Sequence, residues 1–247
     1  MNEYPAAADL KSRAREFLHG KYTPFAGAVL CLLVITVLLN NLFSLFLSGL
    51  IQSFSLTDQV SVSEGIRFFL SLCEMTLITN LIPGLCLFGL KLANHGAPVI
   101  SDLFYAYKNN IQKNIIVSLL LSIPRLLFFM PFLIYSDLLT STFDQSYLIP
   151  SGISLICGLL LSLPADLFLA ASVFLLLDFP GYSTAEVLTA ACRLLRKHWQ
   201  KYLYLELSFL PVICLCILSL GTGLLWGLPY LIMTYTYQYL EIMKPGH

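Results

Sequence analysis

The chain has 247 residues, of which 57% are hydrophobic and only 11% are charged, and its mean hydropathy is +0.79. Soluble domains carry about 25% charged residues, so a soluble core could not hide this much apolar surface and the surrounding solvent must be lipid. The formal net charge is zero, with 14 cations and 14 anions, which argues against a nucleic-acid partner.

The seven cysteines and four histidines show no spacing typical of a metal site or a disulfide framework. Most of the cysteines lie inside apolar runs, and we interpret them as reduced side chains that act as small hydrophobes. No cofactor and no metal are therefore expected. The first 22 residues are polar, and the apolar run after them is longer than the 7–15 or so residues of a signal sequence, so we expect it to remain as the first membrane span.

Six apolar stretches are long enough, or nearly so, to cross a bilayer, which takes about 20 residues. In chain order they are 24–50, about 65–93, 111–136, 150–178, 202–220 and 224 to about 242. Residues 51–63 and 137–149 are predicted loops. Gly221-Thr222-Gly223 predicts a turn so short that the last two spans must be antiparallel neighbours.

Three short amphipathic helices are predicted in front of the odd-numbered spans, beginning near Asp9, Ser101 and Ser183. The third has the clearest start, because Ser183 and Glu186 have the spacing of a capping box. Helices with one apolar stripe and a basic polar side lie in the membrane interface rather than crossing it.

Twelve of the fourteen lysines and arginines fall on one side of this topology, so both termini are expected in the cytoplasm. The cations nearest the span entrances form a predicted interfacial basic collar: Lys21, Lys113, Arg193, Arg196, Lys197 and Lys201. Its expected partners are the anionic lipids of the inner leaflet. Two uses remain open, namely anchoring of the bundle and specific recognition of lipid headgroups.

The pattern of surface helix, lysine and hairpin suggests a loose threefold tandem repeat, with units at 8–93, 99–178 and 183–243. The alternative is that a bilayer imposes similar patterns on unrelated segments. In both cases the fold class is all-α, a polytopic membrane protein with six transmembrane helices in one domain, 1–247.

Four ionisable residues interrupt the apolar runs: Glu74, Arg125, Asp166 and Glu206. A charge at the bilayer centre costs at least about 2.5–3.5 kcal/mol on insertion scales, so each of them needs a partner. Arg125 and Asp166 both lie near the middle of their spans, which predicts an ion pair between spans three and four. Glu74 is a candidate third member of this midplane cluster, whereas Glu206 is interpreted as an interfacial residue near Lys201.

Each midplane charge follows a proline, Pro124 or Pro164, which removes a helical hydrogen bond and frees a carbonyl at that depth. Broken helices beside buried charges are typical of transporter binding sites, so the cluster could line a polar cavity. The alternative is an ion pair that only fixes helix packing.

Both ends of the chain resemble a bacterial integral-membrane family, the domain of unknown function 975. The N-terminal match comprises Leu10-Lys11, Ala14-Arg15, Leu18, Gly20 and Tyr22. The denser C-terminal match comprises Asp178, Pro180, Ser183, Glu186, Lys197-His198-Trp199, Leu207-Ser208-Phe209, Gly221-Thr222-Gly223, Leu225-Trp226 and Pro229-Tyr230. The chain departs from the family pattern at Pro211-Val212, at Pro164-Ala165 and over residues 137–150. The resemblance implies a multi-pass protein of the bacterial cytoplasmic membrane and brings no activity, substrate or catalytic residue with it.

Three functions are compatible with these features. The first is transport of a small solute, or lipid handling, through the midplane cluster. The second is a non-transporting membrane scaffold or an assembly or regulatory factor, which would present its cytoplasmic amphipathic helices to a protein partner of unknown identity. An intramembrane enzyme is the weakest of the three, because no catalytic motif is found, and we expect no enzymatic activity.

Overall fold

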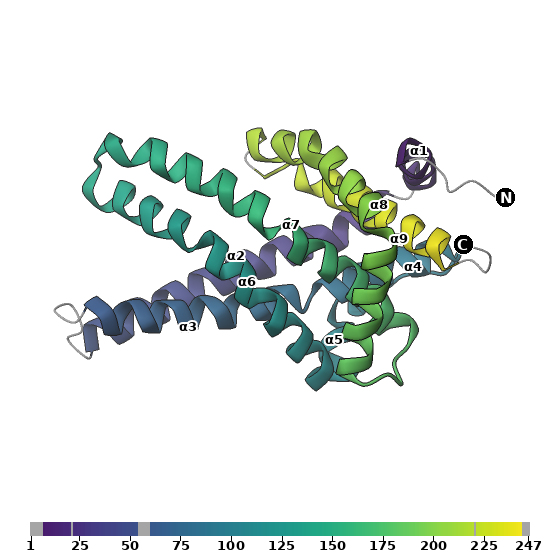
Figure 1. Ribbon diagram of the computed structural model, residues 1–247, viewed down its shortest axis with the longest axis horizontal. Helices are drawn as coiled ribbons and strands as arrows, with labels where there is room; N and C mark the ends of the chain where they lie inside the picture. Colours follow the sequence, from purple (N-terminus) through teal and green to yellow (C-terminus); the bar gives the residue numbers. More distant parts are fainter. Residues whose placement is uncertain (1–6, 21, 54–59, 220, 244–247) are drawn as a thin grey trace.

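The computed structural model describes residues 7–20, 22–53, 60–219 and 221–243, and this part of the chain contains helices and no strand (Figure 1). The predicted all-α class is confirmed. The helices are α1 (Ala7–Leu18), α2 (Tyr22–Ser53), α3 (Val60–Thr79), α4 (Ile82–Ala93), α5 (Tyr105–Lys108), α6 (Ile111–Thr142), α7 (Leu148–Asp178), α8 (Thr184–Leu218) and α9 (Leu224–Ile242), with short 3₁₀ turns at Ile100–Phe104 and Gln145–Tyr147.

Four segments are long and apolar enough to cross a membrane, and they correspond to the first four predicted spans: Tyr22–Leu50, Gly65–Ala93, Ile111–Thr140 and Gln145–Asp178. They form two long hairpins, α2 with α3 and α6 with α7. The hairpins diverge toward the end of the molecule that lies on the left in Figure 1. The last two predicted spans, in α8 and α9, are not among these segments, so the described residues support a multi-pass membrane protein but not the count of six.

The second predicted span is made of two helices rather than one. α3 ends at Thr79 and α4 begins at Ile82, with Pro83 in its first turn, where a missing N–H costs no hydrogen bond. The prolines of the next hairpin act differently. Pro124 and Pro164 lie inside α6 and α7, which continue past them, so the expected break in these helices is absent.

The predicted loop at 137–149 is mostly helical. α6 continues to Thr142, and after the left-handed Phe143 a 3₁₀ turn leads directly into α7. Of the two carboxylates that suggested a loop, Asp137 lies on the exposed last turns of α6, and Asp144 caps the 3₁₀ turn. This error arose because a helix that extends beyond the apolar layer changes its composition without ending.

Two of the three predicted surface helices form as expected. In α1, Leu10, Ala14 and Leu18 form a buried stripe, and Gly20 with φ +81° ends the segment. At the start of α8, the Ser183 N–H donates to Glu186 Oε2 at 2.7 Å and Ser183 Oγ accepts from the Glu186 N–H at 3.3 Å. The predicted capping box is therefore confirmed.

The middle surface helix, predicted to begin near Ser101 in front of the third span, is not one continuous helix. It consists of the 3₁₀ turn Ile100–Phe104 and the four-residue α5, and Asn110 with φ +50° separates it from α6. The segment packs tightly on α4. A Cβ at Gly84 would come within 2.1 Å of the Leu103 carbonyl oxygen, so only glycine allows this approach of two backbones.

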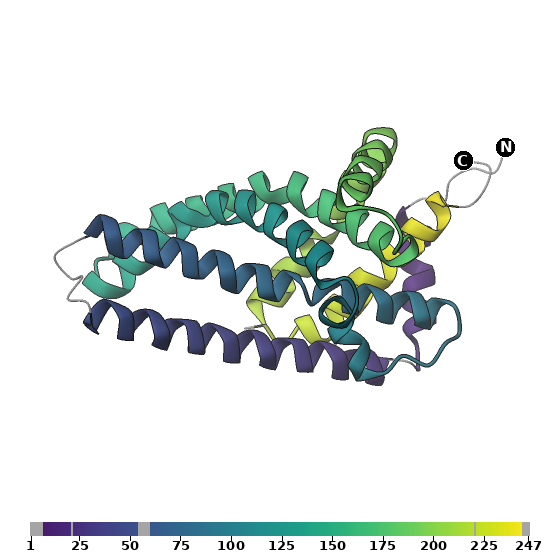
Figure 2. The ribbon, with the colours of Figure 1, turned by 90° about the horizontal axis from the view of Figure 1, so that it is seen from below.

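α8 joins the third surface helix to the fifth predicted span without a gap, with a kink at His198 (φ −126°, ψ 16°). The α8–α9 hairpin closes at Gly221, which has φ +85°. In Figures 1 and 2 this hairpin ends well before the tips of the other two hairpins.

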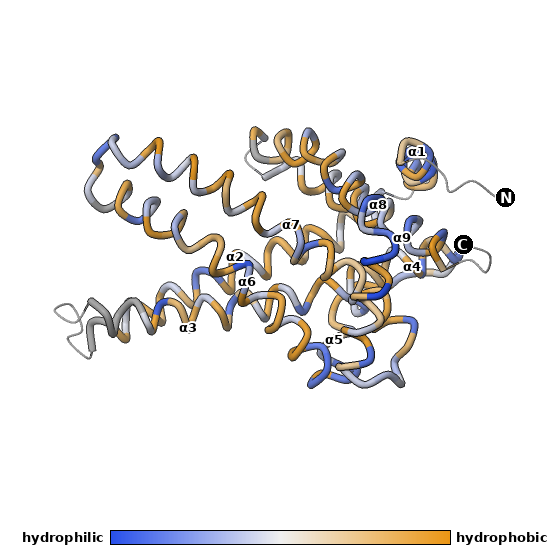
Figure 3. Tube along the Cα trace, viewed as in Figure 1, coloured by the Kyte–Doolittle hydropathy of each residue, from blue (hydrophilic) through white to orange (hydrophobic). Residues whose placement is uncertain are grey.

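The hydrophobic core lies at the end of the molecule where α1, α4, α9 and the second half of α7 meet. α9 is the central helix there, and Met233 and Tyr239 are fully buried. Farther out, α2, α6 and α7 expose large apolar side chains, such as Leu38, Leu120 and Leu160, which suit contact with lipid. In Figure 3, hydrophilic residues gather near the start of α6 and around the bend of α8. The threefold repeat stays a prediction.

Candidate functional site

Arg125 of α6 and Asp166 of α7 form the predicted ion pair, with 3.0 Å between Arg125 Nη2 and Asp166 Oδ1. Both side chains are about three-quarters shielded, at 24% and 23% exposure. Asp166 also accepts a hydrogen bond from Ser162 Oγ, one turn earlier on α7, at 3.2 Å. Arg125 Nε is buried and has no hydrogen-bond acceptor among the described residues. The pair therefore satisfies only part of the hydrogen-bonding capacity of the guanidinium.

The second carboxylate beside this pair is Glu206 of α8. It interacts electrostatically with both Asp166 and Arg125, and it accepts a hydrogen bond from the Tyr235 hydroxyl of α9. The polar network, as we call Arg125, Ser162, Asp166, Glu206 and Tyr235, therefore connects four helices. With Asp166, Glu206 and Arg125 ionised and the Tyr235 hydroxyl protonated, it contains two negative charges and one positive charge.

The interpretation of Glu206 counted only its distance along the chain from Lys201, so it missed the contacts of this side chain with α6, α7 and α9. The neighbouring residues Tyr202, Leu205 and Phe209 are at most 1% exposed, so this face of α8 is packed against the bundle. This stripe was the sequence signal that could have placed Glu206 inside. Tyr235 gave no such signal, because it lies among several tyrosines in α9.

Glu74 is engaged elsewhere. Its Oε1 accepts a hydrogen bond from Asn40 Nδ2 at 3.1 Å, which joins α3 to α2. The structure thus pairs Glu74 within the other long hairpin, and Glu206 rather than Glu74 is the second carboxylate beside the Arg125–Asp166 pair.

The predicted basic collar is spread over two elements. Lys113 at the start of α6 donates to the carbonyl oxygens of Pro180 at 3.1 Å and Tyr182 at 2.8 Å, which fastens α6 to the turn before α8. Arg193 and Arg196 are exposed on α8, followed by Lys197 and Lys201. The pKa of Lys201 is lowered, first by burial and then by the positive charge of Lys197. Lys21 lies outside the described residues.

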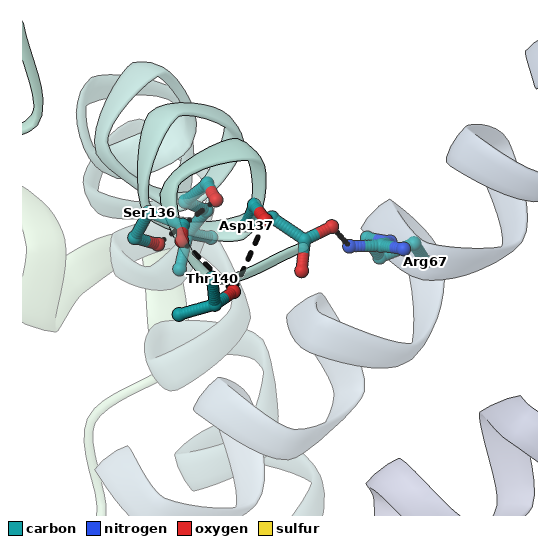
Figure 4. Close-up of polar contacts among 5 residues, drawn as sticks. Arg67, Ser136, Asp137 and Thr140 are labelled. Carbon is teal, nitrogen blue, oxygen red and sulfur yellow. Dashed lines mark hydrogen bonds and ion pairs between the residues drawn. The ribbon is translucent and has the colours of Figure 1, made fainter. Parts of the chain in front are cut away.

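A second ion pair connects the two long hairpins nearer their tips. Arg67 of α3 and Asp137 of α6 point toward each other across the space between the hairpins (Figure 4). Their side chains are 38% and 55% exposed, so water or lipid headgroups can screen this contact.

No group of three or more metal-ligating side chains occurs in the part of the chain that the structure describes. Arg125, Asp166 and Glu206 do not line any of four surface pockets in this part of the chain, which lie between α8 and α9, along α8, beside α4 and beside α1. The polar network contains more carboxylates than cations, and it lies among apolar helices. Such an arrangement favours binding of a proton or a cationic group.

A family described as "Protein of unknown function (DUF975)" matches residues 5–245 of the chain. No curated protein and no solved structure matches this chain.

Proposed function

Since the chain belongs to the DUF975 family, whose function is unknown, we propose a function from its own geometry: transport of a small solute or a lipid through the bacterial cytoplasmic membrane. The polar network is the observation that supports this proposal. It brings two carboxylates and one guanidinium together from α6, α7 and α8 among otherwise apolar helices. Charges at membrane depth are costly and are typical of ion and substrate pathways. Glu206 lies nearer the cytoplasmic end of its predicted span than Asp166 does, as expected for a carboxylate at the entrance of such a pathway.

In the proposed topology both termini face the cytoplasm and the two long hairpins cross the membrane. The α8–α9 hairpin enters from the cytoplasmic side as well. If its turn reaches the outer surface, the chain has the six spans that its sequence predicts. If the turn stays within the bilayer, the chain has four spans and one re-entrant hairpin.

Contacts of α1 favour the topology with four spans and one re-entrant hairpin. Lys11 Nζ donates to the Ser208 carbonyl oxygen at 2.7 Å, and Arg15 lies over the Tyr230 ring. If these two cations mark the headgroup level, ten residues of α8 remain from Ser208 to its end at Leu218. At about 1.5 Å per residue they span roughly 15 Å, half of a hydrocarbon core of about 30 Å.

A flux assay in liposomes tests transport. Purified protein is reconstituted with a trapped pH-sensitive dye in one set of vesicles and a fluorescent phospholipid in another, so that proton movement and lipid movement are measured separately. We expect flux above that of protein-free vesicles in at least one set, and a several-fold loss of it in the Asp166→Asn and Glu206→Gln variants. Asp137→Asn, an exposed carboxylate in the other ion pair, is the matched control.

Flux equal to that of protein-free vesicles in both sets would contradict transport of protons and of lipids. Flux that Asp166→Asn and Glu206→Gln leave unchanged would remove the polar network as the pathway. Circular dichroism and elution volume of each variant establish that it is folded before its flux is compared.

The scaffold function is supported by one observation. The first half of α8 carries exposed Arg193 and Arg196, and Trp199 after the kink is 51% exposed. An aromatic side chain beside arginines suits a protein partner as well as a membrane surface. Under this alternative, the triple variant Arg193→Gln, Arg196→Gln and Trp199→Ala should no longer form a crosslink to a partner protein in the membrane. Its flux in vesicles should equal that of the unmodified chain.

A further inference from the structure

An apolar pocket of about 350 Å³ lies between α8 and α9. It extends from Leu231 on α9 to Gly221 in the turn, and Val212, Ile213 and Cys216 form its α8 wall. Its walls are almost entirely apolar. Its volume falls within the range of about 300–1,000 Å³ that is usual for small-molecule sites. The pocket does not include any member of the polar network.

Two cations of α1 lie at the end of this pocket that is nearer the core. Lys11 donates to the carbonyl of Ser208, one turn before Val212, and its Nζ is 4.2 Å from the centre of the Phe209 ring. The guanidinium of Arg15 is 5.8 Å from the centre of the Tyr230 ring, next to Leu231. Phe209 and Tyr230 contact each other edge to face. The two aromatic rings thus hold the cations beside the two helices that line the pocket.

Neither cation is paired with a carboxylate among the described residues, in contrast to Arg13 on the same helix, which pairs with Glu241 at 2.9 Å. The two positive charges also act on each other. The pKa of Lys11 is lowered, first by burial and then by the charge of Arg15. An anion placed between them would relieve this repulsion and satisfy the hydrogen-bond donors that remain.

We propose that α1 and the α8–α9 hairpin together bind one anionic phospholipid of the inner leaflet, with its phosphate at Lys11 and Arg15 and an acyl chain in the pocket. The orientation follows from the placement of the site. A lipid of the cytoplasmic leaflet has its headgroup at the level of α1 and its chains directed toward the membrane centre, which is the direction in which the pocket runs. The proposal rests on the proposed membrane orientation and does not depend on transport.

Native mass spectrometry of the detergent-purified full chain, together with its thermal unfolding, tests this site. Three additives are compared: phosphatidylglycerol, phosphatidylcholine with the same acyl chains, and inorganic phosphate. We expect one phosphatidylglycerol to remain bound per chain and to raise the unfolding temperature. Phosphatidylcholine is expected to bind at least about tenfold more weakly, since two interfacial cations favour an anionic headgroup. Phosphate alone should have no effect at equal concentration.

Two kinds of variant separate the headgroup contact from the chain contact. Lys11→Gln with Arg15→Gln should reduce phosphatidylglycerol binding about tenfold, down to the level of phosphatidylcholine. Leu228→Trp, which fills the pocket, should reduce binding of both lipids. The matched control is Lys108→Gln, which removes an exposed cation outside the basic collar and should leave binding unchanged. If the α1 double variant is poorly folded, the single variant of the exposed Arg15 replaces it.

Equal retention of the two phospholipids by the unmodified chain would overturn the proposal. So would an unfolding temperature that phosphate raises as much as phosphatidylglycerol does, because the acyl chain would then contribute nothing. A lipid-free dimer as the main species would assign the pocket to a second copy of the chain instead. Loss of vesicle flux in the polar-network variants has no bearing on any of these outcomes.

Discussion

Removing the carboxylate of Asp166 leaves the guanidinium of Arg125 shielded among apolar helices without its counter-ion. Loss of one partner of a buried ion pair costs several kcal/mol, so we expect Asp166→Ala to lower the free energy of unfolding by about 3 kcal/mol. Unfolding in mixed micelles with increasing dodecyl sulfate measures the change. The double variant Arg125→Met with Asp166→Leu should recover most of the loss, because no unpaired charge remains. A double variant as unstable as Asp166→Ala would show that the pair contributes more than charge compensation.

The capping box of α8 predicts a dependence of stability on pH. Hydrogen bonds from the Ser183 N–H, and next from its hydroxyl, lower the pKa of Glu186 from its usual 4.5. The stabilisation is therefore complete above pH 4.5 and is lost as the pH falls through the lowered value. Ser183→Ala should cost about 1 kcal/mol, typical of a lost N-cap. It should also reduce the stability difference between pH 6 and pH 3, measured by thermal unfolding. The Glu186→Gln variant should lack the part of the pH-dependent stability that comes from this carboxylate. If its stability depends on pH as that of the unmodified chain does, other carboxylates cause the dependence.

At the residue scale, counting residues from the ends of a span predicts how deep a side chain lies in the membrane, provided that the helix is long and uninterrupted. Arg125 and Asp166 lie on neighbouring helices of one hairpin, so counting residues from each end placed them at the same level. Glu74 and Glu206 could not be placed in this way. Their hydrogen-bond partners, Asn40 and Tyr235, lie on the other helix of the same hairpin, and Glu206 also approaches Asp166 and Arg125 of a different hairpin. Which side chains meet in this way is set by packing, which residue counts along one span do not contain.

Close approach of two elements produces the clearest prediction at the element scale. A methyl group at Gly84 would overlap the backbone of the 3₁₀ turn at Leu103, and neither backbone can move aside easily. We expect Gly84→Ala to lower the free energy of unfolding by about 1–3 kcal/mol, as overpacking of a tight core does. Gly27→Ala is the matched control, because open space surrounds Gly27 in α2 and alanine favours a helix. Equal stability of the two variants would contradict the close contact between α4 and this turn.

Hydrophobic length and capping residues predicted most elements. α2, α6, α7 and the start of α8 follow from long apolar runs or from Ser183. The failures differ in cause. Asn110 adopts a left-handed conformation, which asparagine tolerates better than most residues, and this separates α5 from α6. α3 ends at Thr79 and α4 begins just before Pro83, a break that a count of apolar residues does not show. At 137–142, polar composition was taken for a loop although helical hydrogen bonding continues.

For the whole molecule, the depth of the α8–α9 hairpin decides between four and six spans. The polar groups of its turn are largely satisfied internally. Thr222 Oγ1 donates to the Ser219 carbonyl at 2.8 Å, the Gly223 N–H donates to Ser219 Oγ at 2.8 Å, and the Gly221 N–H donates to the Cys216 carbonyl at 2.9 Å. A turn at the water surface has no need of such bonds, whereas a turn within hydrocarbon cannot form without them.

We therefore expect the turn to stay inside the bilayer, and single-cysteine labelling in a variant without the seven native cysteines tests this. A membrane-impermeant maleimide added to intact cells should modify Ser146→Cys, in the connection between α6 and α7, and should leave Thr222→Cys unmodified. Ser12→Cys on α1 should react only after the cells are permeabilised, which checks the orientation. The six-span topology places Trp226 at the outer interface, so it requires Thr222→Cys to react from outside as readily as Ser146→Cys. The ten residues of α8 beyond the Lys11 contact are too few for that, because at about 1.5 Å per residue the hairpin reaches only the middle of the membrane.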